Sequence, residues 1–155
     1  MSVRTRDYQP EDFDTLCDID RRCFPPGIAY SPEDISIVLL EPGAFVVVGE
    51  VAQASTCVPS TAGFILARRE RAGRAHIITI DVLTEYRRSG LGTMLLGEAH
   101  RRLMALGAQR VILEVSLENA SAIAFYHKHG YTENRRLKNY YLGHEDAWQM
   151  VRTLV

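Results

Sequence analysis

Hydrophobic and polar positions follow two periods in the N-terminal part of the chain. Residues 3–7 look like a short strand, and residues 10–23 then repeat with helical spacing, beginning with a Pro-Glu-Asp first turn. Pro25 and the residues after it end this helix. A second helix begins at the Ser-Pro-Glu-Asp of residues 31–34 and ends near 42–43.

The middle of the chain changes to the period of strands and then returns to that of a helix. Residues 44–50, 63–69 and 75–82 read as three strands joined by polar loops, which predicts a β-meander. An amphipathic helix opens after Gly90 and ends at Gly107. Its apolar positions are Leu91, Leu95, Ala99, Leu103 and Leu106.

The C-terminal part predicts one more strand–helix unit and a closing pair of strands. Residues 110–115 read as a buried strand, and residues 119–130 as a helix with an asparagine N-cap and a glycine C-cap. Residues 131–141 and 147–154 form two strands around a Gly-His turn. We therefore expect a single α/β domain over residues 1–155, with a mixed central sheet of about six or seven strands flanked by four helices.

Composition and charge narrow the class of protein further. The 155 residues are 46% hydrophobic and 24% charged, with a net charge of −1. A net charge this close to zero does not favour binding to nucleic acid or to an anionic membrane, so neither is an expected partner. Cys17, Cys23 and Cys57 form no CxxC pair, which predicts free thiols in a reducing compartment and no metal site. The N-terminus lacks the apolar run of a signal peptide, and we expect a cytoplasmic protein.

The turn before the third helix carries the strongest chemical signal. The first N–H groups of a helix have no internal partner and lie at the positive end of the helix dipole. Gly90 and Gly92 leave this backbone open, and Arg87 and Arg88 add positive charge. A ligand that carries a diphosphate is the natural partner of such a turn.

Two common diphosphate motifs do not fit this turn. A P-loop requires Lys-Ser/Thr after its last glycine, whereas Thr93 follows Gly92. The dinucleotide fingerprint requires a third glycine where Leu95 stands. Plain turn chemistry remains an open interpretation of the glycine pair taken alone.

Arg87, Gly90 and Gly92 match the pattern Gln/Arg-x-x-Gly-x-Gly/Ala, and with it the chain resembles the GNAT superfamily of acyl-CoA N-acyltransferases. Within that superfamily it is similar to the protein N-terminal acetyltransferases, above all to the bacterial family that acetylates the N-terminal alanine of a ribosomal protein. The matching segments are Leu113-Glu114-Val115, Asn119, Ala122-Ile123, Phe125-Tyr126, Gly130-Tyr131, Lys138-Asn139-Tyr140-Tyr141 and Glu145-Asp146-Ala147.

The resemblance implies acetyl-CoA as the cosubstrate, held between two parallel strands that splay apart. It places residues 80–82 on one strand and Val115 at the end of the other, with the Val82 amide holding the acetyl carbonyl. Asn119 reads both as a helix cap and as a contact to the pantetheine arm. The implied acetyl-CoA residues are Ile80, Asp81, Val82, Arg87, Arg88, Ser89, Gly90, Leu91, Gly92, Thr93, Asn119 and Tyr126. Asp81 departs from the small residue usual in this family.

The resemblance also implies the acid–base residues. Glu114 stands in an apolar strand, where the residues alone favour a solvated face, and the family pattern makes it the general base. Tyr126 matches the tyrosine beside the cofactor sulfur, although an aromatic ring in a helix also suits the core. His76, on the same predicted strand face as Ile78, Ile80 and Val82, and Tyr86 are the alternative bases.

The acceptor implied by the resemblance is a peptide or protein N-terminus. Phe24, Pro25 and Tyr30 match one wall of the family's peptide site, and Tyr140 and Tyr141 match the other. The loop at residues 26–29 departs from the family, which leaves the first residue of the acceptor open. A small-molecule amine is the alternative acceptor, and a non-catalytic acyl-CoA-binding module is the alternative class. The oligomeric state is not fixed by the sequence.

Overall fold

The computed structural model describes residues 1–55 and 58–154, so Cys57 lies outside the described residues. Within these ranges Cys17 and Cys23 are free thiols, and none of the helices is long and apolar enough to cross a membrane. The elements in chain order are β1 (Ser2–Asp7), η1 (Pro10–Asp12), α1 (Phe13–Cys23), α2 (Pro32–Leu39), β2 (Ala44–Ala52), β3 (Ser60–Arg69), β4 (Arg74–Val82), η2 (Thr84–Tyr86), α3 (Leu91–Ala105), β5 (Arg110–Ser116), α4 (Ala120–Lys128), β6 (Thr132–Tyr141) and β7 (Glu145–Thr153).

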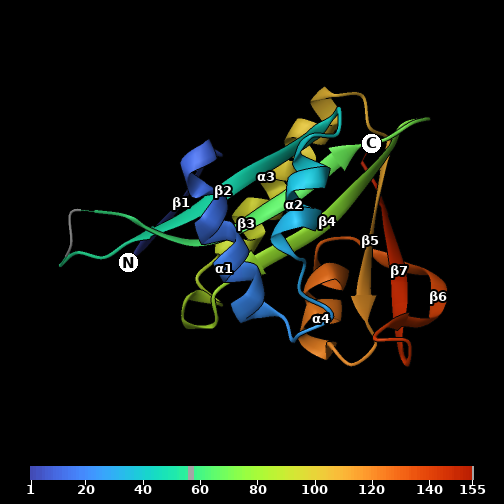
Figure 1. Cartoon of the computed structure of the whole chain (residues 1–155). Coiled ribbons are helices and arrows are strands. Elements are labelled where there is room, and N and C mark those ends of the chain that lie inside the picture. The colour runs from blue at the N-terminus through green and yellow to red at the C-terminus, as the bar shows by residue number, and fades with distance from the viewer. Residues whose placement is uncertain (56–57, 155) are drawn as a thin grey trace.

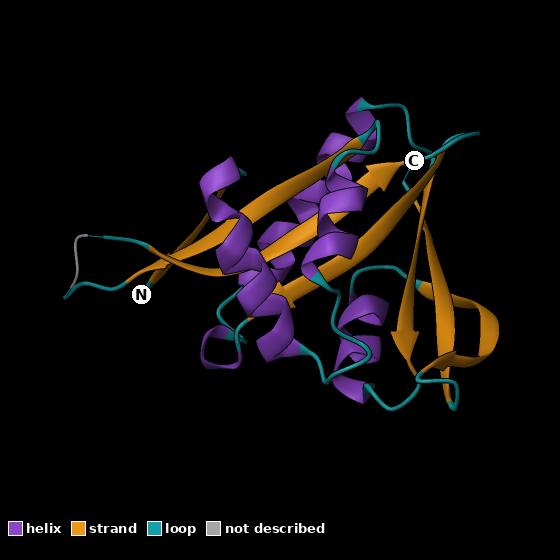
Figure 2. Ribbon diagram, in the orientation of Figure 1, coloured by secondary structure: helices purple, strands orange, loops and turns teal. Residues whose placement is uncertain are grey.

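The described strands form one seven-stranded mixed sheet in the order β1-β2-β3-β4-β5-β7-β6 (Figure 1). All neighbours are antiparallel except β4 and β5, which the α3 crossover makes parallel. Helices α1 and α2 lie on one face of the sheet and α3 on the other (Figure 2). This confirms the predicted α/β fold with its mixed sheet and four helices.

Two buried clusters hold these layers together. The first, here called the α3 cluster, packs the inner side chains of α3 and Tyr126 of α4 against the sheet. The second, the α1 cluster, packs Leu16 and Ile19 of α1 against the opposite face. Burial of apolar surface on both faces explains why the central strands are almost wholly hydrophobic.

A β-bulge in β4 changes the face to which its side chains point. In the pairing with β3, Leu66 opposes Thr79 and Ala67 opposes Ile77, so Ile78 is the extra residue. Ile78 packs in the α1 cluster, whereas Ile80 and Val82 pack against the α3 cluster. The prediction that His76 shares a face with Ile80 and Val82 is therefore wrong, because a one-residue bulge reverses a period of two.

Most helix ends lie where the sequence predicts. The Ser31 hydroxyl accepts a hydrogen bond from the Asp34 amide at 3.1 Å, and Asn119 Oδ1 accepts one from the Ala122 amide at 3.2 Å. Gly107 and Gly130 take the positive φ of glycine C-caps, +84° and +88°. The second helix ends earlier than predicted, at Leu39, and residues 10–12 form a 3₁₀ turn ahead of α1.

A buried histidine joins α3 to the far end of the sheet. Arg152 Nη1 donates to His100 Nδ1 at 3.0 Å, so the proton of the neutral ring lies on Nε2, which donates to the Tyr131 hydroxyl at 2.6 Å. Burial, followed by the charges of Arg152 and His129, lowers the pKa of His100 to about 4. The fold thus holds this imidazole in its neutral form.

We expect this histidine to make the fold sensitive to mild acid. An unfolded histidine titrates near 6.5, so the unfolded chain binds the extra proton between about pH 4 and 6.5. The contribution is complete above that range and is lost as the pH falls through it, which lowers the free energy of unfolding by about 3 kcal/mol. Urea unfolding of the protein and of His100→Asn across this range measures the difference. Equal pH dependence of the two proteins would contradict the assignment.

Candidate active site

Strands β4 and β5 separate soon after they begin. They pair only where residues 74–76 of β4 meet residues 110–112 of β5. Beyond this point Ile77–Val82 and Leu113–Ser116 have no pairing with each other, while each remains paired on its outer side to β3 or β7. This confirms the predicted splay, and it leaves backbone groups of both strands facing the gap.

The turn that follows β4 presents free backbone donors at the start of α3. Arg88 and Gly90 adopt positive φ of 62° and 89°, which turn the chain sharply into the helix. The Leu91 amide donates only to the Ser89 hydroxyl, at 3.3 Å, and within the described chain no acceptor meets the Gly92 and Thr93 amides. Such a set of N–H groups suits an anion.

The two glycines of this turn serve different purposes. A Cβ on Gly90 would meet nothing within 4 Å, so glycine is needed there for its left-handed φ. A Cβ on Gly92 would lie 3.4 Å from the Phe125 ring and 3.9 Å from Val82, so a large side chain has no room on that side. Arg88 is exposed, whereas Arg87 Nε donates to the Val82 carbonyl at 3.0 Å.

Glu114 lies on β5 beyond the point where the strands separate, on the α1 side of the sheet. Its side chain is only 12% exposed, and His76 Nε2 lies 2.7 Å from its Oε1. The Tyr140 hydroxyl donates to the same oxygen at 3.4 Å. Oε2 has no partner among the described residues, so one carboxylate oxygen is left for a substrate or water. The structure thus brings the predicted base and its alternative, His76, together.

A second carboxylate lies behind His76. Glu70 Oε2 is 3.4 Å from His76 Nδ1, although the two atoms are not aligned for a hydrogen bond. Arg68 and Arg74 also pair with Glu70, at 2.8 and 2.9 Å. The imidazole therefore lies between two carboxylates, those of Glu114 and Glu70. Sequence reasoning missed Glu70, because a glutamate in an arginine-rich turn reads as a surface residue.

Aromatic residues from the α1–α2 loop and from the end of β6 border this acid–base group. The Tyr30 hydroxyl donates to the Ile78 carbonyl at 3.4 Å, and burial, followed by Tyr140 and Glu114, raises the pKa of Tyr30 well above its usual value. The Tyr140 and Tyr141 rings meet edge to face with centroids 4.8 Å apart. Predicted residues of both walls therefore lie near Glu114.

The two loops also touch each other. A Cβ on Gly27 would lie 2.2 Å from Leu142 Cδ2, so the loop between α1 and α2 meets the turn between β6 and β7. Pro25 begins the tight turn of this first loop, because its carbonyl accepts from the Ile28 and Ala29 amides at 3.1 Å. Phe24 caps α1 through its amide. Within the part of the chain that the structure describes, neither Phe24 nor Pro25 hydrogen-bonds to Glu114.

The remaining predicted residues divide between the gap and the core. Tyr126 is 8% exposed, its hydroxyl bonds to no described residue, and burial, followed by the charge of Asp81, raises its pKa well above the usual value. Tyr86, the other alternative base, packs between the two clusters. Asp81 is 1% exposed, and its side chain accepts a hydrogen bond from Thr79 and lies close to Asp20 of α1, so Asp81 borders the gap through its backbone.

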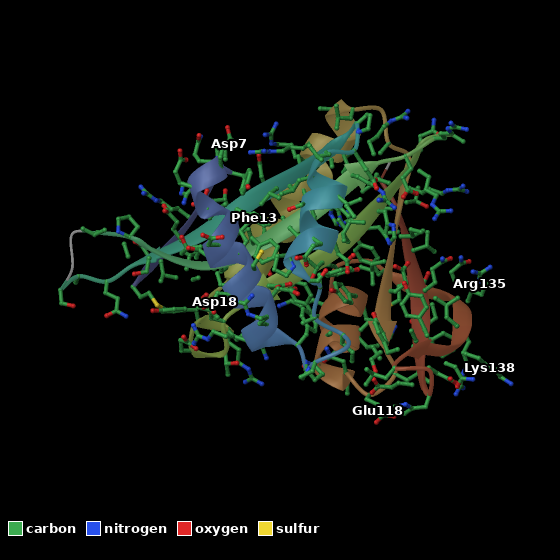
Figure 3. All side chains as sticks on the ribbon, viewed as in Figure 1. Asp7, Phe13, Asp18, Glu118, Arg135 and Lys138 are labelled. Atoms are coloured by element: carbon green, nitrogen blue, oxygen red, sulfur yellow. The ribbon has the colours of Figure 1, made fainter. Side chains whose placement is uncertain are left out.

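Surface hollows lie elsewhere. One of about 430 Å³ opens between α1 and α2, and one of about 420 Å³ opens between the end of β5 and the β6–β7 hairpin. None of the predicted site residues lines either of them. Glu118, which Figure 3 shows at the periphery, lines the second of them.

Comparison with known proteins agrees with this geometry. Residues 13–131 match the model of the acetyltransferase (GNAT) family. The N-alpha-acetyltransferase of Saccharolobus solfataricus is 42% identical over 83 residues, which cover 52% of this chain and 49% of that protein. The chain spans about half the length of such curated relatives.

Solved structures give the same fold over the whole chain. Ard1 from Thermoplasma volcanium superposes with a TM-score of 0.87 at 25% identity, covering 100% of this chain and 99% of that one. The ribosomal-protein-S18-alanine N-acetyltransferase from Escherichia coli gives a TM-score of 0.83 at 24% identity, covering 99% and 94%.

The chain therefore belongs to the acetyltransferase (GNAT) family, whose members are acyl-CoA-dependent N-acetyltransferases. Among its relatives it is similar to the N-alpha-acetyltransferases.

Proposed function

We propose that residues 1–155 act as one catalytic domain that transfers an acetyl group from acetyl-CoA to the α-amine of a peptide or protein N-terminus. The observation that carries the proposal is the Glu114 carboxylate, bonded to His76 at 2.7 Å beside the gap between β4 and β5. We place the reaction in the cytoplasm, with protein N-termini, including those of ribosomal proteins, as acceptors.

The chain's own groups supply the acid–base steps. Only a neutral amine attacks a thioester, so Glu114 takes the ammonium proton through water. His76, hydrogen-bonded to Glu114, holds this carboxyl group in place. The amine nitrogen then bonds to the acetyl carbon while the Val82 amide donates to the carbonyl oxygen. The carbon–sulfur bond breaks while Tyr126 donates a hydrogen bond to the departing thiolate, and the thiolate takes up the proton that the former amine nitrogen loses as it becomes the amide.

The residues of the α3 turn fit the diphosphate of acetyl-CoA. The free amides of Gly92 and Thr93 would bind phosphate oxygens, and exposed Arg88 would add a charge-assisted donor. Ser89 and Leu91 shape this turn. Asn119, in addition to capping α4, would contact the pantetheine arm, as would the backbone of residues 80–82.

A peptide terminus fits the acceptor side better than a small amine. Tyr30, in the α1–α2 loop, and Tyr140, at the end of β6, border Glu114 beside the place where Gly27 meets Leu142. Phe24, Pro25 and Tyr141 would extend these walls, which suits a chain that enters amine-first between two loops. The names of the relatives point to the same acceptor class.

Mass spectrometry of a peptide library incubated with acetyl-CoA tests the proposal. We expect acetylation at the α-amine, with a preference among first residues. A parallel panel of free amino acids, polyamines and aminoglycosides tests the alternative. Turnover of small amines without turnover of any peptide would overturn the peptide assignment, and CoA binding without any turnover would indicate a non-catalytic module.

Tyr126→Phe tests the role of the phenol. We expect kcat to fall by about tenfold with little change in acetyl-CoA affinity, because only one hydrogen bond to the leaving group is lost. Tyr131→Phe is the matched control, since Tyr131 is also buried but its hydroxyl bonds to His100. Steady-state kinetics in which both variants retain the wild-type kcat would remove Tyr126 from the mechanism.

A further inference from the structure

Two aspartates from separate elements meet in the interior on the α1 side of the sheet. Asp20, near the end of α1, is 0% exposed, and Asp81, on β4, is 1% exposed. The carboxyl group of Asp20 is close enough to that of Asp81 to oppose its ionisation. Two buried carboxyl groups in contact do not both ionise, because burial and mutual repulsion each oppose the second charge. The acetyl transfer described above uses neither side chain.

The hydrogen bonds around the pair leave room for one proton. Asp20 Oδ2 accepts from the Tyr30 amide at 2.6 Å, and Asp81 Oδ1 accepts from the Thr79 hydroxyl at 2.6 Å. The other oxygens, Asp20 Oδ1 and Asp81 Oδ2, are fully buried and receive no donor from the described residues. A proton between these two oxygens satisfies both of them.

The surroundings place that proton on Asp81. Burial, followed by the contact with Asp20, raises the pKa of Asp81 well above its usual value, and Arg87 opposes this rise. Cys23 on α1, Tyr30 in the following loop and Tyr126 on α4 also face Asp81. These three groups are uncharged at neutral pH, so Arg87 is the cation that acts on the pair.

We propose that Asp20 and Asp81 share one proton and, through the Tyr30 backbone, fix the loop between α1 and α2 as a wall of the acceptor site. This rests on the proposed function in taking that wall as the place where the amine substrate binds. Asp20 and Asp81 are positioning residues, since they act through Tyr30 and touch no reacting atom. Ionisation of Asp81 sets two anions side by side, which displaces the Asp20 carboxylate and releases the Tyr30 amide.

The pH dependence of acceptor affinity tests the pair in the full chain. We expect the KM for a peptide acceptor to rise by roughly three- to tenfold as an alkaline titration ionises Asp81, the factor that one lost hydrogen bond produces. Asp81→Asn donates permanently to Asp20 and should abolish this rise. The KM for acetyl-CoA should follow the same pH profile in both proteins. A rise in Asp81→Asn equal to that of the wild type overturns the proposal.

Two further variants separate positioning from stability. Asp81→Ala leaves Asp20 without its partner and should raise the acceptor KM across the whole pH range. Glu50→Gln is the matched control, because Glu50 is a buried carboxylate that pairs with Arg4 and Arg6 far from the site. We expect it to lower stability and leave the acceptor KM unchanged. Equal effects of both variants on the acceptor KM overturn the proposal.

A measurement without substrate tests, independently of turnover, whether ionisation of Asp81 releases the Tyr30 amide. The Tyr30 amide resonance of the ¹⁵N-labelled protein should move during alkaline titration in the wild type and stay in place in Asp81→Asn. A Tyr30 resonance that moves equally in both proteins overturns the proposal. If no peptide is acetylated, the proposed function fails, while this titration still reports on the pair.

Discussion

Replacing Glu114 with glutamine is expected to lower kcat for a peptide acceptor by about 10²-fold near neutral pH, the usual contribution of a general base. Glutamine keeps the size of the side chain and can still accept a hydrogen bond from His76, but it takes no proton. Because Glu114 lies on the face opposite the α3 cluster, the Kd for acetyl-CoA should stay unchanged. Stopped-flow or steady-state kinetics with isothermal titration measures both quantities.

The pH dependence of kcat gives a second test of the role of Glu114. A peptide α-amine titrates near pH 8, so the deficit of Glu114→Gln should shrink as the pH rises and the amine loses its proton without help. Glu118→Gln is the matched control, because Glu118 lies at the periphery just beyond β5 (Figure 3). An unchanged kcat in Glu114→Gln near neutral pH would remove Glu114 from the role of base.

Replacing Gly92 with tryptophan should weaken acetyl-CoA binding by at least about 10²-fold, as expected when a phosphate subsite is lost. The Gly92 Cβ position already meets Phe125 at 3.4 Å, so an indole is forced toward the free amides of the first helical turn. Isothermal titration with CoA measures the loss, and circular dichroism verifies that the fold persists.

Gly97→Trp is the control for this substitution. Gly97 lies in the same helix, is exposed, and has nothing within 4 Å of its Cβ position. It should bind CoA as the wild type does. Wild-type affinity in Gly92→Trp would show that the α3 turn does not hold the diphosphate.

The fold followed from the sequence because each element carries a local signal. Gly107 and Gly130 stop their helices through positive φ, and Ser31 and Asn119 cap theirs, all within a few residues. The bulge at Ile78 could not be read in this way. Residues 77–80 are all β-branched, so each of them suits a strand and none marks where the alternation shifts.

The site was predictable where chemistry leaves a mark along the chain and hidden where it depends on distant partners. The turn around Gly90 and Gly92 is contiguous, and so it was visible. The contact of His76 with Glu114 joins residues 38 apart, and the Asp20–Asp81 pair joins α1 to β4. Contacts of this kind arise from sheet order and burial, which a linear reading does not contain.

The extra residue at Ile78 also defines how this strand can tolerate change. Because Thr79 already opposes Leu66, losing the codon for Ile78 would remove the bulge and leave residues 79–82 opposite the same partners and on the same faces. Gaining a codon after Ile80, without a further bulge, would instead point the carboxyl group of Asp81 among the leucines of α3 and turn Val82 toward α1. This part of the chain can therefore absorb the loss of one residue more readily than the gain of one.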